Sequence, residues 1–142
     1  MAFSDFGVTL VDRMMTWVYK KSDGRLGSRL GKMGMLVLQT TGRKSGQERS
    51  HTLQYMPDGE NYVIVASNNG QDRHPGWYYN ILSNPHVRIQ IERRQQPALA
   101  IVAEPEEYAG LWPRLIAQNP PWGAYARRTT RKIPVVILHP LN

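Results

Sequence analysis

The chain has 142 residues, of which 41% are hydrophobic, and it contains seven tyrosines and four tryptophans. These values predict one globular domain with its own core and exclude a disordered chain. Lysine and arginine give a net charge of +7, which favours an anionic ligand or partner, and the absence of cysteine excludes disulfides, thiolate nucleophiles and iron–sulfur or zinc–thiolate sites.

Residues 1–21 have apolar side chains at helical spacing and predict an amphipathic helix. This helix is expected either to pack on its own domain or to lie on a membrane surface, for which Trp17 and the cations after it are suited. Asp5, Asp12 and Arg13 exclude a signal peptide, and no apolar run reaches the roughly 20 residues of a spanning helix. We therefore expect a cytoplasmic protein, with peripheral contact at the inner membrane face as an option.

Residues 22–34 are rich in glycine and basic side chains, and they predict a loop before the first strand. The Gly31-Lys32 pair is not a Walker phosphate loop, because Leu26 and Met33 stand where that motif needs glycine and serine or threonine. A GxGxxG fingerprint is also absent from the sequence. The classical nucleotide-binding α/β folds are therefore disfavoured.

The first predicted strand, residues 35–40, leads into a heptad in which two glycines enclose three polar side chains. Glycine adopts positive φ at little cost, and successive backbone N–H groups can bind an anion. Arg43 and Lys44 add charged donors to the same loop. Residues 40–46 thus predict a phosphate site, although a hairpin turn with a solvated charge pair has the same composition.

Apolar runs downstream predict five further strands and two helices. The strands are residues 47–56, 61–67, 86–92, 97–103 and 133–138, and the helices begin near Pro75 and Glu104. Residues 122–132 are aromatic and then basic, and no element is assigned to them. Six short strands without βαβ order predict an α+β, mainly β fold, a small antiparallel barrel formed by residues 34–142.

Side chains with catalytic chemistry are few. The four histidines show no metal-ligand spacing, so no metal is expected. Ser45 lacks the glycine pattern of a nucleophile elbow. An enzyme whose bound cofactor performs the reaction would show this pattern, and so would a plain binding module.

Three blocks of the sequence occur in a characteristic order, residues 36–46, 65–70 and 74–85. They read LVLQTTGRKSG, VASNNG and HPGWYYNILSNP, and together they resemble the deazaflavin-dependent nitroreductase family. The resemblance extends over residues 30–140. It implies a six-stranded split β-barrel that binds coenzyme F-420, an 8-hydroxy-5-deazaflavin with a phosphate and an oligoglutamate tail.

The same resemblance implies which residues bind the coenzyme. The 42–46 loop would hold the phosphate with Arg49 nearby, residues 66–70 would lie beside the deazaflavin, and Arg73 would lie near the acidic tail. At helical spacing, Trp77 also suits the core. The implied cofactor-binding residues are Gly42, Arg43, Lys44, Ser45, Gly46, Arg49, Thr52, Leu53, Ala66, Ser67, Asn68, Asn69, Gly70, Arg73, Pro75, Gly76 and Trp77.

In such an enzyme the reduced deazaflavin delivers a hydride from C5 to a bound acceptor, which requires orientation more than a catalytic side chain. The resemblance places the substrate pocket at Trp122 and Tyr125, two residues that could equally cap the barrel. Asn119 and Trp122 stand where nitro-reducing relatives look to have tyrosines. A quinone or enone is therefore the favoured acceptor over a nitroaromatic compound.

Two alternatives stay open at this point. The barrel could bind FMN, which also has a phosphate, although this is less favoured than F-420. The chain could instead be a non-catalytic module that binds a polyanion or an acidic membrane surface through Arg127, Arg128, Arg131 and Lys132. A nucleic-acid partner is not expected because these cations lack an aromatic stacking platform. Monomer and homodimer are both compatible with the sequence.

Overall fold

The computed structural model describes residues 29–30 and 33–141. The amphipathic helix predicted within residues 1–21 lies outside the described residues. The described elements, in chain order, are β1 (Arg29–Leu30), β2 (Met33–Thr41), β3 (Glu48–Asp58), β4 (Asn61–Val65), the 3-10 turn η1 (Asn68–Gly70), α2 (Gly76–Ser83), β5 (His86–Ile91), β6 (Arg94–Val102), α3 (Pro105–Gln118), α4 (Pro121–Arg128) and β7 (Val135–Pro140).

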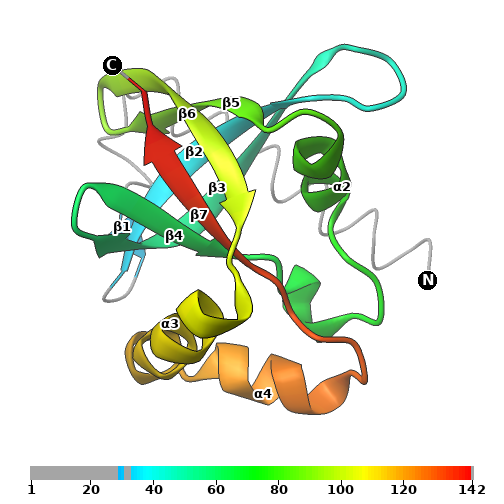
Figure 1. Cartoon of the computed structure of the whole chain (residues 1–142), viewed down its shortest axis with the longest axis vertical. Coiled ribbons are helices and arrows are strands. Elements are labelled where there is room, and N and C mark those ends of the chain that lie inside the picture. The colour runs from blue at the N-terminus through cyan, green and yellow to red at the C-terminus, as the bar shows by residue number, and fades with distance from the viewer. Residues whose placement is uncertain (1–28, 31–32, 142) are drawn as a thin grey trace.

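The strands form one antiparallel sheet that closes on itself (Figure 1). The strand order is β1-β2-β3-β4-β7-β6-β5, and β2 also pairs with β5, so that six strands form a barrel with β1 attached to β2. In the closing ladder Leu38 lies opposite Ile89. The predicted six-stranded antiparallel barrel is confirmed.

Apolar residues in β4 and β7 face two separate cores. Val136 and Leu138 of β7 join the cluster inside the barrel, whereas Val135 and Ile137 join a second cluster beneath α3 and α4. Successive side chains of a strand point to opposite faces, so a strand covered on both faces needs apolar residues at every position. This explains why the sequence of β7 reads as a continuous apolar run.

The three described helices cover the barrel at two places. Helix α2 packs against the barrel interior cluster through Trp77 and Ile81. Helices α3 and α4 lie together across one end of the barrel, where Leu111, Leu115 and Trp122 fill the second core (Figure 1). The described helices include none that is long and apolar enough to cross a bilayer.

Two elements differ from the sequence-based expectation. Arg29–Leu30 forms the short strand β1 within the region predicted to be a loop. Helix α4 occupies part of residues 122–132, to which no element was assigned. Pro121 is the first residue of α4, where its missing N–H costs nothing.

Candidate functional site

The loop between β2 and β3 is a closed turn. Gly42 N–H donates to Gln47 O at 2.7 Å, and Gly46 N–H donates to Gly42 O at 2.8 Å. Gly46 has a φ of 71°, which glycine adopts readily. A Cβ at Gly42 would lie 3.0 Å from Ser45 Oγ and 3.1 Å from Gln47 O, so the interior of the loop has no space for a side chain at this position.

The backbone N–H groups of this loop are largely used by the protein itself. Besides the two closing bonds, Arg43 N–H donates to Asn80 Oδ1 at 3.2 Å, and Gln47 N–H donates to Ser45 Oγ at 3.2 Å. The N–H groups of Gly42, Arg43 and Gly46 are therefore not available to an anion, and the expectation that several loop N–H groups bind one stays a prediction for Lys44 and Ser45. Besides the backbone N–H groups of Lys44 and Ser45 and the Ser45 hydroxyl, charged side chains are the donors of this loop.

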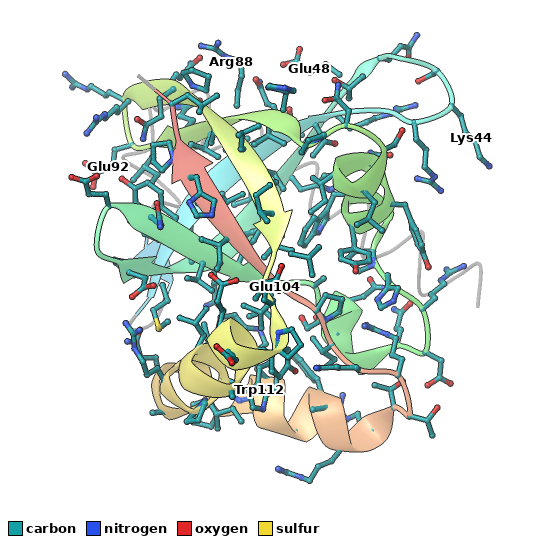
Figure 2. All side chains as sticks on the ribbon, in the orientation of Figure 1. Lys44, Glu48, Arg88, Glu92, Glu104 and Trp112 are labelled. Carbon is teal, nitrogen blue, oxygen red and sulfur yellow. The ribbon has the colours of Figure 1, made fainter. Side chains whose placement is uncertain are left out.

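Those side chains are exposed at the loop and next to it. Lys44 lies at the outer end of the loop and points away from the barrel (Figure 2). Arg49 Nε lies 3.6 Å from the position of a Cβ built on Gly42, so its guanidinium is beside the loop, as expected. Arg43, Lys44 and Arg49 thus give the loop a local positive charge.

Asn80 of α2 fixes the position of Arg43 and was missed by sequence reasoning. Its side chain is only 5% exposed. Its Oδ1 accepts from Arg43 N–H and, at 3.1 Å, from Arg43 Nη1, while its Nδ2 donates to Thr40 Oγ1 at 3.1 Å. The residue sits inside the third block of the resemblance, but its partners are about forty positions away in the sequence, at |i−j| of 37 and 40.

The Arg43 guanidinium is oriented by further contacts to α2. Nη1 also donates to Gly76 O at 3.4 Å, and the guanidinium carbon lies 5.2 Å from the centroid of the Tyr79 ring. Nε and Nη2 make no hydrogen bond among the described residues, and a guanidinium has five N–H donors. Arg43 is therefore held in place while most of its donors are available to an anion.

The segment after β4 has an unusual backbone. Asn68, Asn69 and Gly70 have φ values of 48°, 56° and 76°, three successive residues in the left-handed region. Asparagine tolerates this conformation better than most residues, but single instances are already uncommon and concentrate at functional sites. Residues 66–70 are the segment that the resemblance placed beside the deazaflavin.

Arg131, which follows α4, binds this segment although the two are far apart in the sequence. Its Nε donates to Gln71 O at 2.8 Å, its Nη2 to Ser67 O at 2.7 Å and its Nη1 to Ala66 O at 3.3 Å. The sequence-based alternative counted Arg131 among solvated cations for a polyanion. That role is wrong for Arg131, because it is half-buried and its donors are taken up by backbone carbonyls.

His74 connects the same segment to α2. Arg131 Nη1 lies 3.0 Å from His74 Nδ1. Because a guanidinium can only donate, Nδ1 accepts and the proton of the neutral ring lies on Nε2. The ring also packs on Tyr78 with centroids 4.6 Å apart. Burial, together with the positive charge of Arg131, lowers the pKa of His74 below its ordinary value of 6.5.

The two residues predicted to form the substrate pocket lie in different surroundings. Tyr125 is half-buried and packs directly against Gly70, where a Cβ built on the glycine would lie 3.1 Å from Tyr125 Cα. Trp122 is only 5% exposed and belongs to the second core. The structure therefore brings Tyr125, but not the Trp122 side chain, to the surface of the predicted deazaflavin segment.

The remaining predicted residues are spread along the same part of the molecule. Thr52 and Leu53 are half-buried in β3, opposite Val37 and Leu36 of β2. Trp77 is 3% exposed and lies in the barrel core, which leaves its side chain little surface for a ligand. Of the other three, Pro75 is half-buried, and Arg73 and Gly76 are exposed.

Comparison with known proteins decides the family. A family model described as "F420H(2)-dependent quinone reductase" matches residues 10–140. The chain belongs to this family. Membership makes the protein an oxidoreductase dependent on coenzyme F-420, so the predicted family, enzyme class and cofactor are confirmed.

Individual relatives of this F420H(2)-dependent quinone reductase family member agree with the family model. An F420H(2)-dependent quinone reductase of Mycobacterium tuberculosis is 40% identical over 137 residues, which cover 93% of this chain and 91% of the relative. A solved F420-H2 dependent reductase is 35% identical with a TM-score of 0.68, covering 74% of this chain and 93% of its own. A structure described as a domain-swapped dimer is 31% identical to this chain, with a TM-score of 0.70. The match covers 87% of this chain and 98% of that structure's chain.

The residues of this family member fit an acidic phosphorylated coenzyme. The Arg49 guanidinium lies beside Gly42, next to the exposed cations Arg43 and Lys44 of the loop. We call residues 42–46, residues 66–76 and Tyr125 together the coenzyme face. Arg43 contacts Gly76 and Gly70 contacts Tyr125, so the three parts of this set lie next to one another.

Proposed function

We propose that the protein binds coenzyme F-420 along the coenzyme face, with the phosphate at the 42–46 loop and the deazaflavin ring beside residues 66–70, and reduces a quinone bound next to Tyr125. Family membership supports the coenzyme and the quinone acceptor. The observation that supports the placement is the 42–46 loop, which carries the exposed cations Arg43 and Lys44 and lies beside the exposed cation Arg49.

In this arrangement the protein binds and orients the coenzyme and the acceptor, and the coenzyme supplies the chemistry. Reduced F-420 provides a hydride at C5 of the deazaflavin. Arg43 is already fixed by Asn80, so little side-chain entropy is lost when it binds an anion. Residues 66–70 hold one side of the ring at a fixed position, which aligns it with an acceptor on the other side.

Tyr125 is the residue of the coenzyme face with a hydroxyl suited to the acceptor. A quinone that gains a hydride develops negative charge on an oxygen, and a phenol O–H placed nearby donates a hydrogen bond to that oxygen. In this proposal Trp122 supports α4 from the core and does not touch the acceptor. The absence of tyrosine at positions 119 and 122 favours a quinone over a nitroaromatic compound as the acceptor.

The proposal is tested by ligand titration followed by turnover. We expect oxidised F-420 to show a saturable fluorescence change with micromolar protein and FMN to show none. A panel of quinones, enones and nitroaromatic compounds with reduced F-420 should then give turnover that is fastest with quinones. Binding of FMN in preference to F-420, or turnover restricted to nitro compounds, would contradict it.

A substitution of Lys44 tests the position of the phosphate. Lys44 is exposed and makes no hydrogen bond or ion pair among the described residues, so Lys44→Ala should leave the melting temperature unchanged. Loss of one charged hydrogen bond is worth about 1.5–3 kcal/mol, so the Kd for F-420 should rise at least tenfold. Arg93→Ala, which removes an equally exposed cation in the turn between β5 and β6, is the matched control and should leave Kd unchanged.

A further inference from the structure

Arg131 directs three of its five N–H groups to backbone carbonyls of one short segment and a fourth to the side chain of His74. Four of its five N–H groups reach Gln71 O, Ser67 O, Ala66 O and His74 Nδ1, at 2.8, 2.7, 3.3 and 3.0 Å. Thr129 Oγ1 donates to Asp72 Oδ1 at 2.8 Å from the same segment. Residues 129–131 thus contact both ends of the left-handed turn at residues 68–70.

Contacts other than those of Arg131 also hold this segment: Ala66 N–H donates to Pro134 O at 2.9 Å, and Gly70 packs against the backbone of Tyr125. Gly70 N–H donates to Ser67 O at 2.9 Å, Gln71 N–H donates to Asn68 O at 3.1 Å, and Asn68 Nδ2 donates to Arg73 O at 3.1 Å. These three bonds are within the segment, whereas the Ala66 bond and the Gly70 contact connect it to the residue before β7 and to α4. Among the described residues, Arg131 is the group that binds the carbonyls before and after the turn at once.

The Arg131 guanidinium is not placed to bind a ligand anion. One N–H group remains after the four contacts, and the side chain is half-buried between α4 and residues 66–74. A guanidinium presents its donors in a rigid plane, which lets a single side chain bind several carbonyls in fixed directions, whereas an ammonium is a point charge on a flexible chain. Arginine is therefore suited to determine the shape of this backbone.

We propose that Arg131 is a positioning residue for hydride transfer, which holds residues 66–74 in the conformation that supports the deazaflavin ring and orients His74 as the Nε2–H tautomer. This inference rests on the proposed function, because it takes residues 66–70 as the support of the ring. It assigns to Arg131 an action through the backbone and not through direct contact with the coenzyme.

The first test uses the protein without coenzyme. Amide hydrogen exchange measured by mass spectrometry should show faster exchange within residues 66–74 in Arg131→Gln and Arg131→Lys than in the wild type, with the strands unchanged. Arg127→Gln removes an exposed cation from the same region and should match the wild type. Arg131→Lys preserves the charge and is the milder change should the glutamine variant fail to fold.

The second test follows the His74 ring. In long-range proton–nitrogen NMR spectra, with the His74 signals identified by their absence from His74→Gln, wild-type protein should show the Nε2–H tautomer. Both Arg131 variants should show a mixture of tautomers. An unchanged tautomer would overturn the assigned role of Arg131 in orienting the ring. A general loss of stability would not by itself produce the expected change of tautomer.

The third test measures coenzyme binding and turnover. Both Arg131 variants should raise the Kd for oxidised F-420 at least tenfold and lower kcat with reduced F-420, whereas the quinone KM should stay within about twofold of the wild type. Equal affinity in the Arg131 and Arg127 variants would overturn the proposal. If the wild type itself fails to bind F-420, the proposed function fails, and the exchange and NMR results separate that failure from an error about Arg131.

Discussion

Asn80 shows how one buried amide can prepare a charged side chain for a ligand. Three hydrogen bonds connect it to Arg43 and Thr40, so the loop after β2 and helix α2 have one relative position. An aliphatic side chain at position 80 would leave Arg43 N–H and the buried Thr40 hydroxyl without a partner, whereas the amide pairs with both. The cationic loop is therefore preorganised before any anion binds.

Replacing Asn80 with alanine should damage both stability and binding. Asn80→Ala leaves the buried Thr40 hydroxyl and the Arg43 N–H without their partner, which costs about 1–3 kcal/mol of the free energy of unfolding. Urea unfolding should show this loss, and titration should show weaker F-420 binding. Ser83→Ala, at the exposed end of α2, is the control and should change neither quantity by more than about 0.5 kcal/mol. Unchanged F-420 affinity in Asn80→Ala would contradict the preorganisation of Arg43.

His74 should make the stability of the coenzyme face depend on pH. The groups facing its ring are Arg131, Tyr78 and Tyr79, and burial with the Arg131 charge lowers the folded-state pKa of His74 below 6.5. The unfolded chain therefore binds more protons at acidic pH. The stability that neutral His74 contributes is complete above about pH 6.5 and is lost as the pH falls toward the folded-state pKa.

A comparison of melting temperatures measures this effect. Between about pH 7.5 and about pH 5.5 the melting temperature of the wild type should fall more than that of His74→Gln, because glutamine still accepts a bond from Arg131 but does not titrate. The other histidines are common to both proteins, so their titration cancels in the difference. An equal fall of the melting temperature in the two proteins would show that His74 does not contribute to the pH dependence of stability.

Some roles of individual residues in the candidate site could be predicted from the sequence and others could not. Arg43, Lys44 and Gly46 are neighbours in the chain, so their clustering in a tight loop was predictable from composition. Asn80 and Arg131 act on partners at |i−j| of 37 to 65, and no local pattern encodes such pairs. Their roles follow only from the closed barrel, which brings distant segments together.

At the scale of elements, η1 and α4 are joined through a glycine. Gly70 is buried, and a Cβ there would lie 3.1 Å from both Cα and Cβ of Tyr125. Because the contact includes backbone, the helix itself would have to move to admit a side chain. The position of the proposed acceptor residue is thus coupled to the position of the proposed deazaflavin support.

Gly70→Ala should therefore be strongly unfavourable. The new methyl group meets α4, and alanine at a φ of 76° adds backbone strain, so a loss of about 1–3 kcal/mol is expected in urea unfolding. Gly110→Ala in α3 is the matched control, since a Cβ there meets nothing within 4 Å and alanine favours the helix by up to about 1 kcal/mol. A neutral Gly70→Ala variant would show that η1 and α4 move independently.

Helices and strands were predictable where buried and exposed residues repeat with the period of the element. Val87 and Ile89 of β5 are buried while His86 and Arg88 are exposed, as the alternation indicated. Helix α3 begins at Pro105, next to the predicted start at Glu104, and Glu107 Oε1 accepts from Glu104 N–H at 2.9 Å at this end of the helix. Helix α4 has only eight residues and no acidic start, and its opening prolines equally indicate the end of another helix.

At the scale of the whole molecule, the ladder between β2 and β5 closes the barrel. Three registered pairs hold it, with Leu38 opposite Ile89 in the middle. Both side chains are almost completely buried, with exposed fractions of 0% and 1%. β2 is thereby paired on both sides just before the 42–46 loop begins, so the loop extends from a fixed strand.

A substitution in the β2–β5 ladder should destabilise the protein more than a substitution at the surface. Ile89→Ala removes a fully buried side chain and should lower the free energy of unfolding by about 2–5 kcal/mol. Ile101→Ala in β6 removes the same atoms from a side chain that is 43% exposed, and its loss should be about 1 kcal/mol or less. Equal losses in the two variants would mean that the β2–β5 contact adds nothing to the barrel.

Strand β7 lies between β4 and β6, although it follows both in the chain. During synthesis on the ribosome, β4 and β6 are therefore complete while the strand that pairs with each of them is still missing. Exposed strand edges of this kind promote association between chains. Arg131 lies shortly before β7, which begins at Val135, so residues 66–74 gain their contacts with Arg131 only in the same late step, and a nascent chain has no finished coenzyme face until β7 has paired.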